Sequence, residues 1–331
     1  MAFTMHSHSG EFCGHAVDTL EDVVQRAIAI GFQTLGLSEH MPRVHAQDLY
    51  PEERGDGSHL EEKLAGLQTK YDNYLQEAIR LREKYAPQIA ILVGFEGEWI
   101  YGKDDDGVRI RAMAAHPEID YFIGSVHHVG ANGTPIDYDK ATFAQAVTTA
   151  TEKLAADSAG STADSTASEK YLHLDYYDQQ LDMLQTLRPR IVGHFDLIRL
   201  LSAAPDISPE SDPTLSCVWP KIERNLKFVA SYGGWLECNT AALRKGLAEP
   251  YPGRAISEAW LRLGGRFTMS DDSHGTAHVA TNYKRGIAFL RELGVKDVWT
   301  LERKYSGKQR TRGALVDKAV SLDDFEASLK M

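Results

Sequence analysis

Histidines and carboxylates occur in this sequence at a spacing that suits metal ligands. His6 and His8 are separated by one residue near the N-terminus, and Asp272 and His274 have the same spacing near the other end. In an extended chain, residues i and i+2 point to the same face, so each pair can present two ligand atoms to one ion. Neutral imidazole and carboxylate are common ligands of divalent transition metals near neutral pH. The two pairs therefore predict a metal-binding site.

Taken one at a time, these residues also fit ordinary structural roles. The N-terminal histidine pair is typical of exposed side chains near a chain end, and the segment around Asp272 is typical of an acidic turn. His15 and His40 fit partly exposed loop positions, and His194 lies in an apolar setting that is usual for a hydrogen-bonded core histidine. The metal-binding interpretation therefore depends on where all these residues fall relative to the predicted secondary structure.

Ligand-type residues follow short apolar or β-branched segments along the chain. These segments predict strands at residues 2–5, 34–38, 89–95, 121–126, 190–193, 235–238 and 266–270. The residues that follow them are, in order, His6, His40, Glu96, His127, His194, Asn239 and the segment from Asp271 to His274. Helical spacing predicts helices at about residues 20–30, 58–85, 140–154, 169–187, 213–231, 254–263 and 278–293, the first with a capping-box pattern at Asp18 and Glu21.

This alternation of strands and helices predicts a parallel sheet with helical crossovers, and seven units favour a barrel over an open sheet. The C-terminal strand ends of such a barrel meet at one mouth, where the chemistry of the fold resides. Six of the seven predicted strand ends carry an ionisable ligand-type residue. Glu96 is favoured over Glu98 as a bridge between two cations, Asp271 lies on the opposite parity to Asp272, and periodicity does not separate His127 from His128.

Composition limits the class of protein. The chain has 331 residues with 43% hydrophobic residues, which is enough for one large α/β domain, and it lacks an apolar run of about 20 residues that would predict a membrane span. A formal net charge of −11 disfavours nucleic-acid binding. Three scattered cysteines are too few for a disulfide framework or a thiolate zinc site and fit reduced thiols. No signal-peptide pattern is evident, so we expect a cytoplasmic protein. The oligomeric state is left open.

We expect a single barrel domain at residues 1–305 and a peripheral C-terminal segment at residues 306–331, with a short helix near residues 322–329. Residues 130–168 look like an insertion. Its end, residues 155–168, is a low-complexity run of alanine, serine, threonine and aspartate. Such a segment lacks the large apolar groups that would offset its ordering entropy, which predicts a flexible surface loop.

In this order the ligand-type residues resemble the pattern of the polymerase-and-histidinol-phosphatase (PHP) superfamily. The metal-ligand positions of that pattern are filled by His6, His8, His15, His40, Glu96, His127, His194, Asp272 and His274. Local segments are similar to the histidinol-phosphatase branch of the superfamily, namely residues 8–13, 37–42, 123–127, 193–199 and 237–245. The main departure from this pattern is length, because residues 130–168 look like an insertion.

This resemblance implies a distorted (β/α)7 TIM-like barrel with three divalent ions, of zinc, iron or manganese. It implies one ion held by His6, His8, Glu96 and Asp272, a second held by Glu96, His127 and His194, and a third held by His15, His40 and His274. The implied reaction is hydrolysis of L-histidinol phosphate to L-histidinol and phosphate in histidine biosynthesis, by attack of metal-bound hydroxide. Glu96, Asp272 and His274 would be the catalytic residues.

Substrate contacts are predicted from residues just beyond the strand ends. Arg199 and Arg244, with Arg43 as a weaker third, are candidates for the phosphate, because guanidinium binds phosphate oxygens through two hydrogen bonds. Each has the alternative role of a surface residue. Glu98 or Glu237 would face the cationic groups of a small phosphorylated amino alcohol.

Three other functions share these residues. A PHP-type nuclease would use the same metals on nucleic acid, a related phosphoesterase would act on another small ester, and a non-catalytic module would only bind metal. The acidic charge and the absence of basic or aromatic-stacking tracts count against the nuclease. The full ligand set and the paired arginines count against the non-catalytic module.

Overall fold

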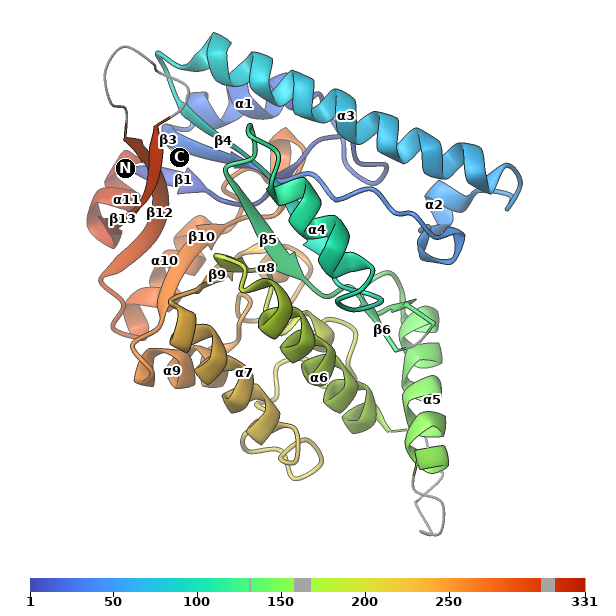
Figure 1. Cartoon of the computed structure of the whole chain (residues 1–331). Helices are drawn as coiled ribbons and strands as arrows, with labels where there is room; N and C mark the ends of the chain where they lie inside the picture. Colours follow the sequence, from blue (N-terminus) through green and yellow to red (C-terminus); the bar gives the residue numbers. More distant parts are fainter. Residues whose placement is uncertain (131, 158–167, 305–312, 331) are drawn as a thin grey trace.

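Seven parallel strands form the central sheet of the computed structural model, which describes residues 1–130, 132–157, 168–304 and 313–330 (Figure 1). Each strand pairs with the next one along the chain, which is the order that right-handed helical crossovers produce. The strands are β1 (Ala2–Thr4), β3 (Phe32–Leu37), β4 (Ala90–Glu98), β5 (Tyr121–Ser125), β8 (Ile191–Val192), β9 (Trp235–Asn239) and β10 (Arg266–Ser270). All seven predicted strands are confirmed.

The first and last strands of this sheet meet and close it. The backbone N–H of Met5 donates to the carbonyl oxygen of Met269 at 3.1 Å. Just beyond this contact the chain pairs again as β2 (Ser7–His8) and β11 (Ser273–His274), which are parallel, with His8 opposite His274. A register shift in β1 and the short β8 make the closure irregular. The expected distorted (β/α)7 barrel is therefore confirmed.

Helices cover the outside of the barrel (Figure 1). The helices of the described residues, which include short ones at the ends of the barrel, are α1 (Leu20–Ala29), α2 (Pro51–Arg54), α3 (Leu60–Tyr85), α4 (Asp106–Ala114), α5 (Lys140–Asp157), α6 (Glu169–Leu187), α7 (Trp219–Tyr232), α8 (Ala241–Arg244), α9 (Arg254–Arg262), α10 (Tyr283–Glu292) and α11 (Leu322–Ser328). Short 3₁₀ turns lie at η1 (Ala46–Asp48), η2 (Leu197–Arg199) and η3 (Thr276–His278). The sequence patterns did not predict α4, whose nine residues carry only a weak amphipathic pattern.

The capping box of α1 lies one residue later than the sequence pattern indicated. Thr19 is the N-cap, its hydroxyl accepts from the backbone N–H of Asp22, and the Asp22 carboxylate accepts from the N–H of Thr19. Asp18 does not cap the helix, because its carboxylate accepts hydrogen bonds from the backbone N–H and the hydroxyl of Thr276. This contact instead ties the loop before α1 to the loop after β11.

The expected insertion contributes ordered structure beside the mouth of the barrel. Its strand β7 (Thr134–Pro135) pairs with β6 (His128–Val129), which directly precedes the expected insertion, and is followed by α5, which lies beside α6 (Figure 1). Most of the predicted low-complexity loop, residues 158–167, lies outside the described residues. Among the helices of the described segments, none combines the length and the apolar character that a bilayer crossing requires.

The C-terminal segment packs against the opposite end of the barrel. β12 (Asp297–Lys304) and β13 (Ala314–Ser321) form an antiparallel hairpin that the sequence patterns did not predict, and α11 confirms the short helix expected near residues 322–329. Phe325 of α11 is fully buried, with its ring centroid 5.0 Å from that of Phe3 in β1 and 5.7 Å from that of Tyr283. The boundary expected at residue 305 falls between the two strands of this hairpin, so the final segment is integrated more closely than a peripheral tail.

We expect Phe325→Ala to destabilise the whole barrel. Removing a buried phenylalanine side chain leaves a cavity and costs about 3–5 kcal/mol of unfolding free energy. Val108→Ala is the control, because Val108 is 57% exposed and a surface truncation changes stability by about 0.5 kcal/mol or less. Urea unfolding followed by circular dichroism measures both changes. Equal midpoints for the two variants would contradict the structural role of α11.

Candidate metal centre

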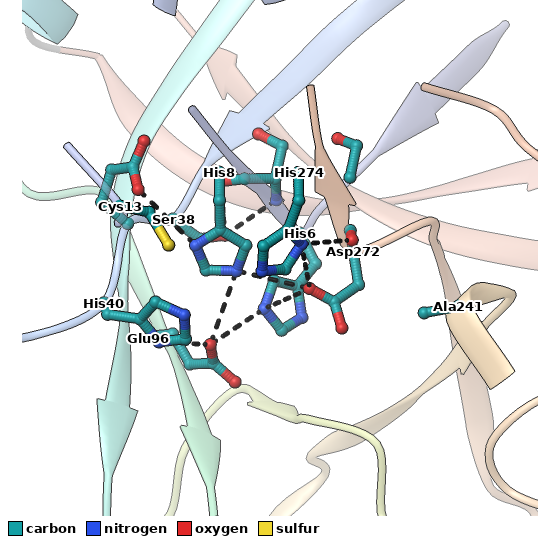
Figure 2. Close-up of polar contacts among 12 residues, drawn as sticks. His6, His8, Cys13, Ser38, His40, Glu96, Ala241, Asp272 and His274 are labelled. Carbon is teal, nitrogen blue, oxygen red and sulfur yellow. Dashed lines mark hydrogen bonds and ion pairs between the residues drawn. The ribbon is translucent and has the colours of Figure 1, made fainter. Parts of the chain in front are cut away.

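Ligand-type side chains from most of the barrel strands meet at the C-terminal mouth. Figure 2 shows six of them, pointing toward one another: His6, His8, His40, Glu96, Asp272 and His274. His6 follows β1, Glu96 lies within β4, and the isolated bridge between His40 and Glu96 carries the contact from the end of β3 to β4. Parallel strands end at the same level, so residues more than 200 positions apart become neighbours.

Glu96 lies at the centre of this cluster and is 1% exposed. Its Oε2 atom lies 3.1–3.5 Å from three imidazoles, and its Oε1 atom lies 3.0–3.3 Å from two more. The ring nitrogens are Nε2 of His6, Nε2 of His8 and Nδ1 of His40 on one side, and Nε2 of His127 and Nε2 of His194 on the other. A carboxylate with imidazoles around both oxygens has the geometry of a bridge between two cations.

Asp272 contacts the same cluster from β10 and β11. Its Oδ1 atom lies 3.4 Å from Nε2 of His8, 3.7 Å from Nε2 of His6 and 3.6 Å from Nδ1 of His274. Its φ of +48° lies in the left-handed region, which costs energy for a residue with a Cβ and is common at functional sites. The neighbouring Asp271 has a structural role, because it accepts hydrogen bonds from the backbone N–H groups of Ser273 and Ala280.

The structure distinguishes two adjacent histidines that sequence periodicity left open. His127 points to Glu96 and lies 2.9 Å from His194 between their Nε2 atoms. His128 is fully buried, its Nδ1 atom is 3.8 Å from Glu98, and its ring packs against Tyr50. His127 is therefore the member of this pair that belongs to the cluster.

Charges within the cluster shift the pKa values of its members in both directions, and a divalent ion would replace the proton of an imidazole whose pKa is raised. Burial by itself would lower the pKa of His6, but the carboxylates of Glu96, Asp272 and Glu237 outweigh it and raise this pKa well above its ordinary value. Burial by itself would raise the pKa of Glu96, but His6 and His127 hold it well below its ordinary value. At His274 burial and the nearby His8 lower the pKa, so this imidazole stays neutral. Ionised carboxylates and neutral imidazoles bind divalent cations.

Several buried polar atoms of the cluster lack a hydrogen-bond partner. They include both ring nitrogens of His8, both ring nitrogens of His40, Nε2 of His6 and Nδ1 of His127. Burying polar atoms in this way is costly unless they bind something. Within the described residues, four groups hold their ligand atoms within 4.8 Å of one another: Cys13, His15, His40 and His274; His6, His8 and Glu96; His8, Asp272 and His274; and His40, Glu96 and His127. This donor set suits divalent metal ions.

His15 lies at the outer side of the cluster and is the most exposed of the predicted ligands. Its Nδ1 atom is 3.2 Å from Oε1 of Glu52, and its Nε2 atom is 3.3 Å from Sγ of Cys13. Its ring centroid lies 5.0 Å from that of His274 and 5.4 Å from that of His40. The structure thus brings all nine predicted metal ligands together at one mouth.

Glu237 supports the cluster from beneath and was proposed from the sequence only as a substrate contact. It is fully buried, with Oε2 3.1 Å from Nδ1 of His6, and its Oε1 accepts from the backbone N–H of His194 at 2.6 Å. The feature of the sequence that indicates this role is the position of Glu237 inside a predicted strand, two residues before the strand-end Asn239. The side-chain amide of Asn239 donates a hydrogen bond to Glu237. Glu237 therefore orients the His6 imidazole, holds the backbone of His194 and does not face solvent.

A cavity of about 570 Å³ opens above the cluster. Apart from the predicted metal ligands, its lining includes the cationic residues Arg244 and Lys245, the acidic residues Glu52 and Asp137, and the aromatic pair Tyr50 and Tyr138. The Arg244 guanidinium is held in place by hydrogen bonds to the backbone oxygens of Asp271 (2.9 Å) and Asp272 (2.8 Å). This predicted phosphate contact therefore lies at the site.

Arg199 and Glu98 do not line this cavity, in contrast to their predicted contacts with substrate. Arg199 donates to Asp196 and to the backbone oxygens of Glu249 and Pro250, and it does not line the cavity. Glu98 is 1% exposed and pairs with Arg43 at 3.1 Å, which also removes Arg43 from the phosphate candidates. Each of these charged side chains is therefore paired within the protein, and neither is available to the substrate in the way that the sequence analysis predicted.

Comparison with known proteins supports the same architecture. The PHP domain family matches residues 4–241. A "Probable histidinol-phosphatase" of Schizosaccharomyces pombe is 38% identical over 93% of this chain and 92% of the relative, and a histidinol-phosphatase of Saccharomyces cerevisiae is 32% identical over 85% of each chain. The crystal structure of a histidinol phosphate phosphatase from Lactococcus lactis, complexed with zinc, L-histidinol and phosphate, is 18% identical, covers 90% of this chain and 95% of its own, and has a TM-score of 0.58.

The barrel topology, the order of the ligand-type residues and the family match agree with one another over most of the chain. The chain therefore belongs to the PHP domain family.

Proposed function

We propose that this chain is a metal-dependent histidinol-phosphatase that hydrolyses L-histidinol phosphate to L-histidinol and phosphate in histidine biosynthesis. Relatives that carry this name match most of the chain. The observation that carries the proposal is the Glu96 cluster at the base of a cavity that also holds a positioned arginine. In this proposal the cluster would bind divalent cations beside a guanidinium that suits phosphate oxygens.

The proposed site would hold three divalent ions, two of which would share Glu96. His6, His8, Glu96 and Asp272 would hold one ion, Glu96, His127 and His194 a second, and His15, His40 and His274 a third. The related Lactococcus lactis structure contains zinc, and His-rich sites of this kind also accept iron and manganese. When bound, such ions neutralise phosphate charge and lower the pKa of water to about 7. Glu96, Asp272 and His274 are catalytic residues in this proposal.

The chain's own residues would bind and orient the substrate. Arg244 is half-buried and fixed by two backbone oxygens, so its remaining N–H groups can face phosphate without much loss of side-chain entropy. Histidinol phosphate also carries an ammonium and an imidazole, which need an anionic partner. Glu98 and Glu237 are buried in other contacts, so we assign this role to Asp137, whose carboxylate lines the cavity beside Tyr138.

We expect His8→Ala and Asp272→Ala to lower kcat/KM for histidinol phosphate by more than about 100-fold, because losing a ligand costs more than losing a residue that merely orients one. The metal content per chain should fall in parallel, as measured by elemental analysis. His116→Ala, at an exposed position outside the cluster, is the control and should change neither quantity. Near-normal turnover of both ligand variants in metal-replete buffer would refute the site.

Glu237→Gln should weaken metal binding by about 10–100-fold, because the carboxylate that orients a ligating histidine also raises its basicity. The variant keeps the shape of the side chain, so the unfolding midpoint of the metal-free protein should change far less than metal affinity does. Competition with a chelator measures the affinity. Unchanged affinity would show that the contact between Glu237 and His6 serves packing alone.

Asp137→Asn should raise KM for histidinol phosphate by about 10-fold, which corresponds to about 1.4 kcal/mol of lost pairing with the substrate cation. KM for p-nitrophenyl phosphate, which has no cationic group, should stay the same. Asp139→Asn is the matched control, because this exposed carboxylate lies on the same loop and accepts from the N–H of Thr142. A similar loss with both substrates would mean that Asp137 supports the site rather than recognises the substrate.

A further inference from the structure

Cys13 lies within the cluster, although the order of ligand-type residues in the sequence did not include it. Its side chain is 6% exposed, and Figure 2 places it on the same side of the cluster as His40. Its Sγ atom is 3.3 Å from Nε2 of His15, and Sγ and one ring nitrogen from each of His15, His40 and His274 all lie within 4.8 Å of one another. A sulfur and three nitrogens at this separation can surround one ion.

We propose that Cys13 is the fourth ligand of the ion held by His15, His40 and His274, and that this ion has a site of one thiolate and three imidazoles. This inference rests on the proposed function, which includes a third ion. It adds a ligand and a chemical preference that the three histidines by themselves do not define.

The three histidines are each oriented so that one ring nitrogen is left for the ion. Nδ1 of His15 contacts Glu52 at 3.2 Å, and Nδ1 of His274 contacts the backbone oxygen of Asp272 at 2.9 Å. Nδ1 of His40 makes no hydrogen bond of good geometry but lies 3.0 Å from Oε1 of Glu98, so its Nε2 is also the nitrogen left for the ion. An oxygen acceptor beside Nδ1 favours the tautomer in which Nδ1 carries the proton and donates it, which leaves the lone pair of Nε2 for the ion. The Nε2 atom of His15 is the one that contacts Cys13.

Local backbone structure places Cys13 and His15 on the same loop. The N–H of Cys13 donates to the oxygen of Ser9 at 2.9 Å, and the N–H of Gly10 donates to the oxygen of Val17 at 3.1 Å. The N–H of Ser9 in turn donates to the buried Glu39 carboxylate at 2.7 Å. The loop is therefore tied at both ends, and its sulfur does not depend on a flexible segment for its position.

A thiolate would change both the selectivity and the charge of the site. Sulfur ligands favour zinc and iron over manganese and magnesium, and four protein ligands complete the tetrahedral geometry that zinc prefers. Because all four positions are filled by the protein, activation of water would fall to the other two ions. The thiolate would also add one negative charge, which would bring the net positive charge of the metal site closer in magnitude to the charge of a phosphate dianion.

Cobalt is the probe that tests this inference, because cobalt(II) replaces zinc and absorbs in the near ultraviolet when a thiolate binds it. Protein stripped of metal and reloaded with cobalt(II) should show this sulfur-to-cobalt band, and Cys13→Ser should abolish it and weaken the binding of one ion by about 10-fold or more. Cys217→Ser is the matched control, because Cys217 is exposed, and it should keep the full band. The wild-type spectrum needs no mutation, so the test does not depend on how a variant folds.

The outcomes separate this inference from the proposed function. A wild-type protein that binds three cobalt ions and hydrolyses histidinol phosphate without a sulfur band would overturn the role of Cys13 and leave the phosphatase assignment intact. A sulfur band that Cys13→Ser abolishes, in a protein with no phosphatase activity, would support the cysteine ligand and refute the phosphatase. A band that survives in Cys13→Ser would overturn the inference.

Discussion

The contact between one buried carboxylate and five imidazoles is the constraint on which the rest of the site depends. Glu96 is 1% exposed and lies at the centre of the barrel mouth, so its charge is stable only with cationic partners close to it. Protonated histidines supply this charge, as the raised pKa values of His6 and His127 indicate, and divalent ions shared among the ligands would supply it with the imidazoles neutral. The arrangement of these side chains therefore suits the binding of metal ions better than it suits the folding stability of a metal-free protein.

The first and last strands of the barrel meet directly beside the ligand cluster, and this closure positions the ligands. The pairing of β2 with β11 sets His8 directly opposite His274, and the hydrogen bond between Met5 and Met269 fixes the two strand ends just below them. Buried residues beneath the ligands then hold their orientation, as Glu237 does for His6. The same interactions that complete the fold thus set the positions of the ligand atoms, which explains why ligands from both ends of the chain share one site.

The surroundings of the cluster divide the charged residues into two groups. Glu98 and Arg43 form a buried pair beside His40, and Arg199 is paired with Asp196, so these charges are already satisfied within the protein. Arg244, Lys245, Glu52 and Asp137 line the cavity, where a substrate can meet them. A cavity with cationic and anionic residues suits a small molecule that carries a phosphate and an ammonium more than it suits a uniformly anionic polymer.

Much of this protein follows from the sequence by itself. Period-two spacing placed His6 with His8 and Asp272 with His274, and the regular alternation of apolar segments gave the seven strands and the barrel, because both patterns depend only on local geometry. The tertiary structure decided the roles of residues whose partners are distant in sequence. It selected His127 over His128 and Arg244 over Arg199, buried Glu98 and Glu237, and brought Cys13 to the cluster. These choices depend on which charge lies across the barrel from each side chain, and local spacing carries no information about that.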